Sequence, residues 1–184
     1  MRIVVLMKPV PDPASGQERL GPDLRVDRAA APSVINGNDE YALEAALKLV
    51  EAHGGEVTLL AMAPPNAPET IRKGLAMGAH RGVHVTDPAL AGSDTLSTAR
   101  VLAAALRTLE YDLVLAGVDT SDGGTGVVPA GVAALLGLPY LSYAARIEPG
   151  DGRVRVDRLS PAGYDVLEAP LPALVGCTQA LGAP

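Results

Sequence analysis

The sequence predicts an α/β fold: a three-layer, doubly wound and mainly parallel sheet with an antiparallel hairpin at its C-terminal edge. Short apolar runs alternate with helical patterns from the N-terminus to Gly137, and this order is typical of a parallel sheet covered by helices on both faces. After residue 140 the pattern changes to consecutive strands joined by a turn, which indicates an antiparallel edge. The length of 184 residues suits one domain, residues 1–184.

The first strand is predicted at Ile3–Met7 and the first helix at Asp39–His53. Asn38 is expected to cap this helix, Asp39 suits its positive end, and Gly54 ends it. Small and aliphatic residues recur at spacings of three and four and form one buried face. They are Ala42, Ala45, Ala46, Leu49 and Val50.

Glu56–Met62 and Gly82–Thr86 are predicted as the next two strands. The helix between them, Ala67–Met77, has a proline in its first turn and a glycine just past its end. The following helix, Ser93–Glu110, is expected to begin with Ser93 as its cap. Its buried face is predicted to contain Leu96, Ala99, Ala103 and Leu106.

The fourth strand, Asp112–Ala116, is followed by the glycine-rich stretch Gly117–Gly126 and a helix over Val127–Leu136. The C-terminal part is predicted to form a hairpin whose turn is Glu148–Gly152, followed by two more strands. The four strands of this part are Leu141–Ile147, Arg153–Leu159, Tyr164–Glu168 and Ala173–Cys177.

The composition excludes several classes of function. A net charge of −6, a pI near 5.0 and the lack of Phe and Trp speak against a nucleic-acid-binding surface. The N-terminal apolar run is too short for a signal peptide, and no later run is long enough to span a bilayer. The single cysteine, Cys177, forms no internal disulfide and is expected to be an inert core residue. We therefore expect a cytoplasmic protein with no direct membrane insertion.

The glycine-rich loop between the fourth strand and its helix is the main candidate for ligand binding. Glycines let backbone N–H groups approach an anion closely, and the helix N-terminus adds a favourable dipole. Thr125 offers a hydroxyl at the same place. The loop lacks the spacing of the P-loop and of the dinucleotide-binding fingerprint, so the alternative is a flexible connection in which Thr125 only caps the helix.

Three strand ends are expected to meet at one edge of the sheet, where open parallel sheets bind ligands. The first strand leads into Lys8–Pro13 and a long polar segment that ends at Asn36–Asn38, and the second ends at Met62–Asn66. A connection as long as the one after the first strand usually has a function in a compact domain, such as ligand binding. We expect an adenine between the first two strands and a phosphate at Gly123–Thr125, that is, a Rossmann-like nucleotide site.

Several segments of the sequence resemble those of one family, the β subunit of electron transfer flavoproteins. The segment Glu69–His84 is similar almost throughout to that family's E-T-I-R-x-x-L-A-M-G-A-D-R-x-x-H segment. Four further segments resemble the family in the same order along the chain. They are Val5–Asp12, Asn36–Ala46, Asp112–Gly126 and Leu171–Val175.

The resemblance implies an electron carrier that is not a catalyst by itself. Family members pair with an α subunit, which holds most of one FAD, and the β subunit binds a structural AMP. Electrons come from donor dehydrogenases and leave to a quinone reductase or another acceptor. Carried over by position, the cofactor-binding residues are Leu6, Asn36, Gly37, Asn38, Asp39, Met62, Gly117, Val118, Asp119, Thr120, Ser121, Asp122, Gly123, Gly124 and Thr125.

The chain departs from the family's pattern in several places. The family continues into a C-terminal arm that embraces the α subunit, whereas this sequence stops at Thr178–Pro184. We therefore expect either a short variant without the arm or an incomplete chain. Pro13 and Asn38 stand where typical members place aromatic rings toward the flavin, and Val127 stands where a glutamine is common. Ser160–Gly163 replaces an acidic cluster.

Other candidate chemistry is weak. His80 and His84 straddle the start of a strand, where their spacing does not bring the side chains together, so a zinc site is not expected. Asp119 and Asp122 are expected to cap the loop and not to act as a carboxylate pair. Lys8 is expected either to touch a phosphate or to be solvated. Two alternative functions remain: an ATP-binding stress-type protein or nucleotide enzyme on a related fold, and an interaction module without redox function.

Overall fold

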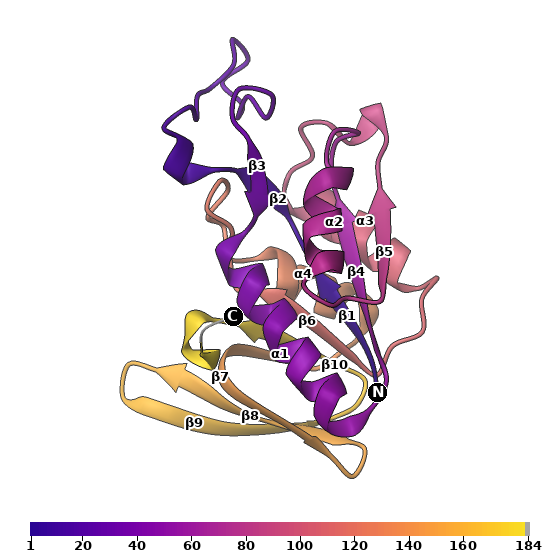
Figure 1. Ribbon diagram of the computed structural model, residues 1–184. Coiled ribbons are helices and arrows are strands. Elements are labelled where there is room, and N and C mark those ends of the chain that lie inside the picture. Colours follow the sequence, from indigo (N-terminus) through magenta and orange to yellow (C-terminus); the bar gives the residue numbers. More distant parts are fainter. Residues whose placement is uncertain (183–184) are drawn as a thin grey trace.

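The computed structural model describes residues 1–182 and contains one eight-stranded sheet with helices on both faces (Figure 1). The strands of this sheet are β1 Arg2–Leu6, β4 Glu56–Met62, β5 Arg81–Val85, β6 Leu113–Gly117, β7 Tyr140–Gly150, β8 Arg153–Ser160, β9 Gly163–Pro170 and β10 Ala173–Cys177. Their order across the sheet is β5-β4-β1-β6-β10-β7-β8-β9. The predicted fold class is confirmed.

The sheet is parallel from β5 to β7 and antiparallel from β7 to β9. In the central register Val4 of β1 lies between Thr58 of β4 and Val114 of β6. The central strands are buried on both faces, as their unbroken apolar sequences predict. The last strand, β10, returns to the parallel part and lies between β6 and β7, a position that the strand pattern alone does not specify.

Four helices cover the two faces of the sheet. They are α1 Gly37–His53, α2 Pro68–Ala76, α3 Thr95–Leu106 and α4 Val128–Leu136. On one face Leu43 of α1 and Ile71 of α2 pack with Val5 and Leu59. On the other face α3 and α4 pack against alternate residues of the same strands, such as Val4 and Leu60. The three predicted layers follow from this alternation.

Two predicted helix starts were wrong. The residue before α1 is Asn36, not Asn38, and its side chain makes no capping hydrogen bond to the helix. The residue before α3 is Asp94, not Ser93, because the Asp94 carboxylate accepts a hydrogen bond of 2.7 Å from the backbone N–H of Ser97. Leu96 then falls in the first turn and is 50% exposed, so its predicted burial was also wrong.

The long segment after β1 contains structure that the sequence did not indicate. β2 Pro9–Pro11 and β3 Ser33–Ile35 form a two-stranded antiparallel sheet. The residues between these strands extend beyond the main sheet (Figure 1). Three short 3-10 helices lie in connections and near the C-terminus: η1 Pro13–Ser15, η2 Pro88–Leu90 and η3 Gln179–Leu181.

The C-terminal hairpin is longer than predicted. Pairing between β7 and β8 continues to Gly150 and Arg153, so the turn is only Asp151–Gly152 and not Glu148–Gly152. Both turn residues have positive φ, 52° and 72°, as the tightest hairpin turns require. Within residues 1–182, no helix combines the length and the apolar character that crossing a membrane requires.

Candidate functional site

The main cavity lies where the strand order reverses. From β1 the chain moves outward to β4 and β5, and it then returns to β6 on the other side of β1. Ligand sites in such sheets form beyond the carboxyl ends of the strands at this reversal. A crevice of about 1360 Å³ occupies this position, and Leu6, Met62 and Gly117 line it at the ends of β1, β4 and β6. The strand ends thus converge as predicted, with β6 adjacent to β1.

Most of the residues predicted for the site line this crevice, but not all of them do. Those that line it are Leu6, Asp39, Met62, Gly117, Val118, Asp119, Thr120, Asp122, Gly123 and Thr125. Five others are not part of the lining and lie just before α1, in its first turn or in the glycine-rich loop. They are Asn36, Gly37, Asn38, Ser121 and Gly124.

The asparagines before and within α1 hold the glycine-rich loop. Asn36 donates a side-chain hydrogen bond of 2.9 Å to the carbonyl of Asp119 and accepts one of 3.1 Å from the N–H of Ser121. Asn38 donates to the Asp119 carboxylate at 2.6 Å. These contacts attach the loop to the helix. Asn36 and Asn38, which were expected to contact a ligand directly, therefore position the loop.

Asp39 joins the ends of the two central strands. Its carboxylate accepts hydrogen bonds from the backbone N–H groups of Lys8 at 2.8 Å and Gly117 at 3.1 Å. The side chain is almost fully buried, and burial raises the pKa of Asp39 to about 7 despite these hydrogen bonds. Glycine is needed at position 117, since a Cβ there would overlap the Asp39 carboxylate and lie 2.7 Å from the Cβ of Asn38.

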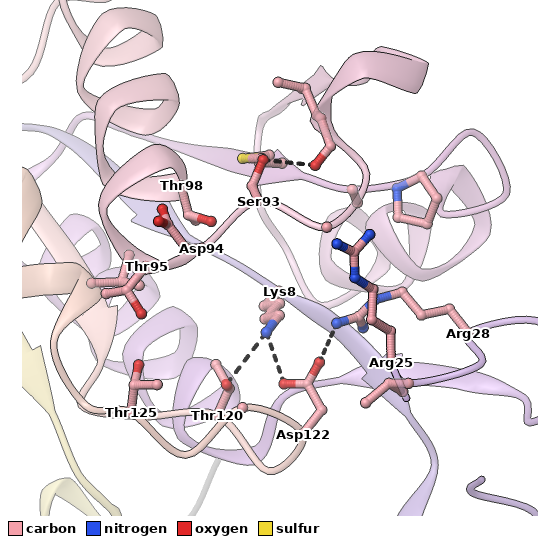
Figure 2. A pocket seen from close by; sticks show the side chains of 18 of the residues that line it. Lys8, Arg25, Arg28, Ser93, Asp94, Thr95, Thr98, Thr120, Asp122 and Thr125 are labelled. Carbon is pink, nitrogen blue, oxygen red and sulfur yellow. Dashed lines mark hydrogen bonds and ion pairs between the residues drawn. The ribbon is translucent and has the colours of Figure 1, made fainter. Parts of the chain in front are cut away.

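A three-residue ion cluster lies at the edge of the crevice. Asp122, whose side chain is 2% exposed, pairs with Lys8 at 2.8 Å and with Arg28 at 2.6 Å. Figure 2 shows the two cations approaching the carboxylate from two sides. Burial, the largest single effect, would raise the pKa of Asp122, but the two cations together outweigh it and hold this pKa below its ordinary value.

This cluster decides one of the two expectations for Lys8. Lys8 is not a fully solvated lysine, because it is paired with Asp122, and its contact with a phosphate stays a prediction. Asp119 and Asp122 have separate hydrogen-bonding partners, which agrees with the prediction that they do not act as a carboxylate pair.

The glycine-rich loop has the backbone conformation that its glycines permit. Gly124 and Gly126 have φ of 58° and 63°, a region that other residues rarely adopt. The N–H of Gly124 closes the turn by donating to the carbonyl of Thr120 at 2.8 Å. The residue before α4 is Val127, with no side-chain cap, so Thr125 does not cap the helix. Its position in the crevice lining favours the phosphate-cradle interpretation.

The sequence patterns did not predict one wall of the crevice. It consists of Leu20–Ala29 in the long segment after β1 and of residues 87–88 and 90–95 before and at the start of α3. The unusual length of the first segment was the available signal, and it did not indicate which of its residues face the crevice. Arg25 and Arg28 both belong to this wall.

The weaker candidates have structural roles. The ring Nδ1 of His80 accepts a hydrogen bond from the N–H of Val57, and the ring of His84 lies 2.9 Å from the carbonyl of Ala63. Among residues 1–182 no group of His, Cys, Asp and Glu side chains could hold a metal ion. Cys177 is buried in β10, where burial raises the pKa of its thiol, as expected of an inert core cysteine.

Residues 23–184 match the model of the electron transfer flavoprotein domain. The chain is also 37% identical to the electron transfer flavoprotein subunit beta of Clostridium acetobutylicum, over 100% of this chain and 71% of that protein. The chain belongs to the electron transfer flavoprotein β subunit family.

Two further relatives of this β subunit family member are similar over nearly the whole chain. The electron transfer flavoprotein subunit beta of Mycobacterium leprae is 41% identical, over 99% of this chain and 71% of that protein. Protein FixA of Azorhizobium caulinodans is 45% identical, over 98% of this chain and 66% of its own length. The chain therefore spans about two thirds of the length of these relatives.

The raised pKa of Asp39 predicts how the stability of this β subunit family member depends on pH. Between about pH 4 and pH 7 the folded protein holds a proton on Asp39 that the unfolded chain releases, so this residue makes folding less favourable as the pH rises. Asp39→Asn lowers the free energy of unfolding by an amount that does not vary with pH, because it alters the hydrogen bonds. It also removes the pH dependence that Asp39 causes. From pH 5 to pH 6, the wild type should lose about 1.4 kcal/mol per pH unit relative to the variant, and this slope should fall to about half near pH 7, where Asp39 titrates in the folded protein.

Urea unfolding at several pH values measures this difference. The control is Asp94→Asn, because the exposed Asp94 carboxylate has a lowered pKa and so titrates below this range. Parallel stability curves for the wild type and Asp39→Asn would contradict the assignment.

Proposed function

We propose that this chain is the electron-carrier β subunit of a heterodimeric electron transfer flavoprotein and that it binds AMP in the crevice at the strand ends. The observation that carries the nucleotide part is the crevice itself, in which a glycine-rich loop and an apolar floor face each other. Leu6, Leu60, Met62 and Ala116 supply the apolar surface for a base. Gly123, Thr125 and the N-terminus of α4 supply the phosphate end.

The space near the phosphate end fits a small anion. A Cβ built on Gly123 would lie 3.3 Å from the Oγ1 of Thr120 and 3.6 Å from the Nζ of Lys8. The missing side chain therefore leaves room beside a hydroxyl and an ammonium group, which are both hydrogen-bond donors.

The charges around the crevice favour a monophosphate over a triphosphate. Lys8 and Arg28 are already paired with Asp122, so the cluster carries one net positive charge. Asp87, Asp94 and Asp119 also line the crevice, and carboxylates repel a highly charged ligand. This balance argues against the alternative of an ATP-binding protein.

The redox part of the proposal rests on the family. The relatives named as subunit beta support a pair with an α subunit that holds most of one FAD, and the bound FAD would supply the change between oxidation states. In this proposal the chain positions the α subunit and holds AMP, while donor dehydrogenases and a quinone reductase or another acceptor exchange electrons with the flavin. A non-redox interaction module is the alternative that the next experiment separates.

Mixing the chain with its cognate α subunit and FAD tests the redox proposal. The chain alone should be colourless, because its crevice at the strand ends is assigned to AMP. The mixture should elute as a heterodimer with flavin absorbance near one FAD per pair. Size-exclusion chromatography with visible absorbance measures both. Flavin bound to this chain alone, or no complex with the α subunit, would contradict the proposal.

Gly123→Val tests the placement of the phosphate. The valine side chain would fill the space beside Lys8, so AMP should bind at least about tenfold more weakly, a loss of roughly 1.4 kcal/mol. Equilibrium dialysis with radiolabelled AMP measures this even if the purified protein already contains AMP, because the label exchanges. Gly150→Val is the matched control, since a Cβ at Gly150 meets no atom within 4 Å. Unchanged affinity in Gly123→Val would show that the phosphate lies elsewhere.

A further inference from the structure

The segment Leu20–Ala29, here called the strap, lines the crevice with all ten of its residues. It is held together by its own contacts. The N–H of Gly21 donates to the carbonyl of Arg25 at 2.7 Å, and Leu20 forms a β-bridge with Val26. Because these bonds are internal to the strap, the segment can move as one unit without breaking them.

The strap touches both sides of the crevice. On one side Arg28 pairs with Asp122 of the glycine-rich loop at 2.6 Å. On the other side the Arg25 guanidinium lies against Gly92, where a Cβ would overlap it. Gly92 precedes α3, so the strap spans the crevice between the loop after β6 and the loop after β5. Figure 2 shows both arginines on this side of the crevice, with Asp122 opposite Arg28.

Because of the ion cluster, the strap can separate from the glycine-rich loop without leaving the buried Asp122 carboxylate unpaired. Removing the sole partner of a buried carboxylate is costly, because the charge is then unpaired away from water. Asp122 has a second partner, Lys8, which lies between β1 and β2 and not in the strap. When Arg28 departs, Asp122 stays paired and the Arg28 side chain, already 36% exposed, becomes solvated. The cluster therefore lowers the cost of separating Arg28 from Asp122.

We infer that the strap is a gate over the nucleotide crevice and that the Arg28–Asp122 pair is its latch. The nucleotide part of this inference rests on the proposed function. The opening of the strap does not, and it is measured separately.

A distance measurement tests the latch without any ligand. Spin labels are placed on Leu24→Cys, in the strap, and on Ala89→Cys, at an exposed position of η2 across the crevice; Cys177 is buried and stays unlabelled. The wild-type background should give mainly one short distance. Arg28→Gln should add a population at longer distances, about tenfold larger than in the wild type, because a charge-assisted hydrogen bond is lost.

Arg19→Gln is the matched control. Arg19 is exposed, directly precedes the strap and pairs with Asp27 inside it and not with any residue across the crevice, so its loss should leave the distance across the crevice unchanged. Asp122→Asn is a second test of the latch from the other side, and melting temperatures verify that each variant is folded. Distances in Arg28→Gln and Asp122→Asn that equal those of the wild type would overturn the latch.

The rates of AMP binding test the gate. With a fluorescent N-methylanthraniloyl derivative of AMP as the probe, Arg28→Gln should speed association and dissociation together, each by about tenfold, and change Kd much less. A change in dissociation alone would instead make Arg28 a direct phosphate ligand and would overturn the gate. If the wild type binds no adenine nucleotide, the proposed function fails, and the distance measurement still decides whether the strap opens.

Discussion

The site depends on the pair of hydrogen bonds that the Asp39 carboxylate accepts from two backbone N–H groups. This pair joins Lys8, two residues after the end of β1, to Gly117, the last residue of β6, and the sheet reverses its order between these two strands. The pair also places the start of α1 against β6, which allows only glycine at position 117. The glycine-rich loop then continues from Gly117 in a direction set by this contact.

The first turn of α1 and the residue before it also fix the position of the glycine-rich loop. Asn36 and Asn38 bind the backbone and side chain of Asp119, so the loop is attached to the helix at the same end as Asp39. Asp122 is attached from the other side, through Lys8 and Arg28. A loop held by hydrogen bonds at two of its residues, here Asp119 and Asp122, is preordered, and ordering before binding reduces the entropy cost of holding a ligand.

The sequence predicted features that depend on local patterns. Unbroken apolar runs indicated β4 and β6, the β10 segment was predicted with its observed bounds, and α4 ends at Leu136 as predicted, followed by Gly137 in a left-handed conformation. The helix starts failed where two neighbouring residues could both cap: Asn36 or Asn38, and Ser93 or Asp94. The side chain of Asn36 instead forms a hydrogen bond with the glycine-rich loop, more than eighty residues away.

The features that were missed depend on distant pairs or on atypical strands. Lys8 and Arg28 lie 114 and 94 residues from Asp122, and no local spacing indicates such a cluster. β2 is the tripeptide Pro9–Pro11, and prolines argue against a strand in any pattern-based prediction. The strap contains neither a helix nor a long strand, so only the structure shows that it faces the crevice.

The nucleotide content of the purified protein tests the central claim most directly. Native protein is denatured, the protein is removed, and the supernatant is separated by anion-exchange chromatography with mass detection. The account predicts AMP at close to one molecule per chain, because the crevice combines an apolar floor with a phosphate end of low net charge. Protein that is free of adenine nucleotide, and that takes up no AMP when it is added, would contradict the account.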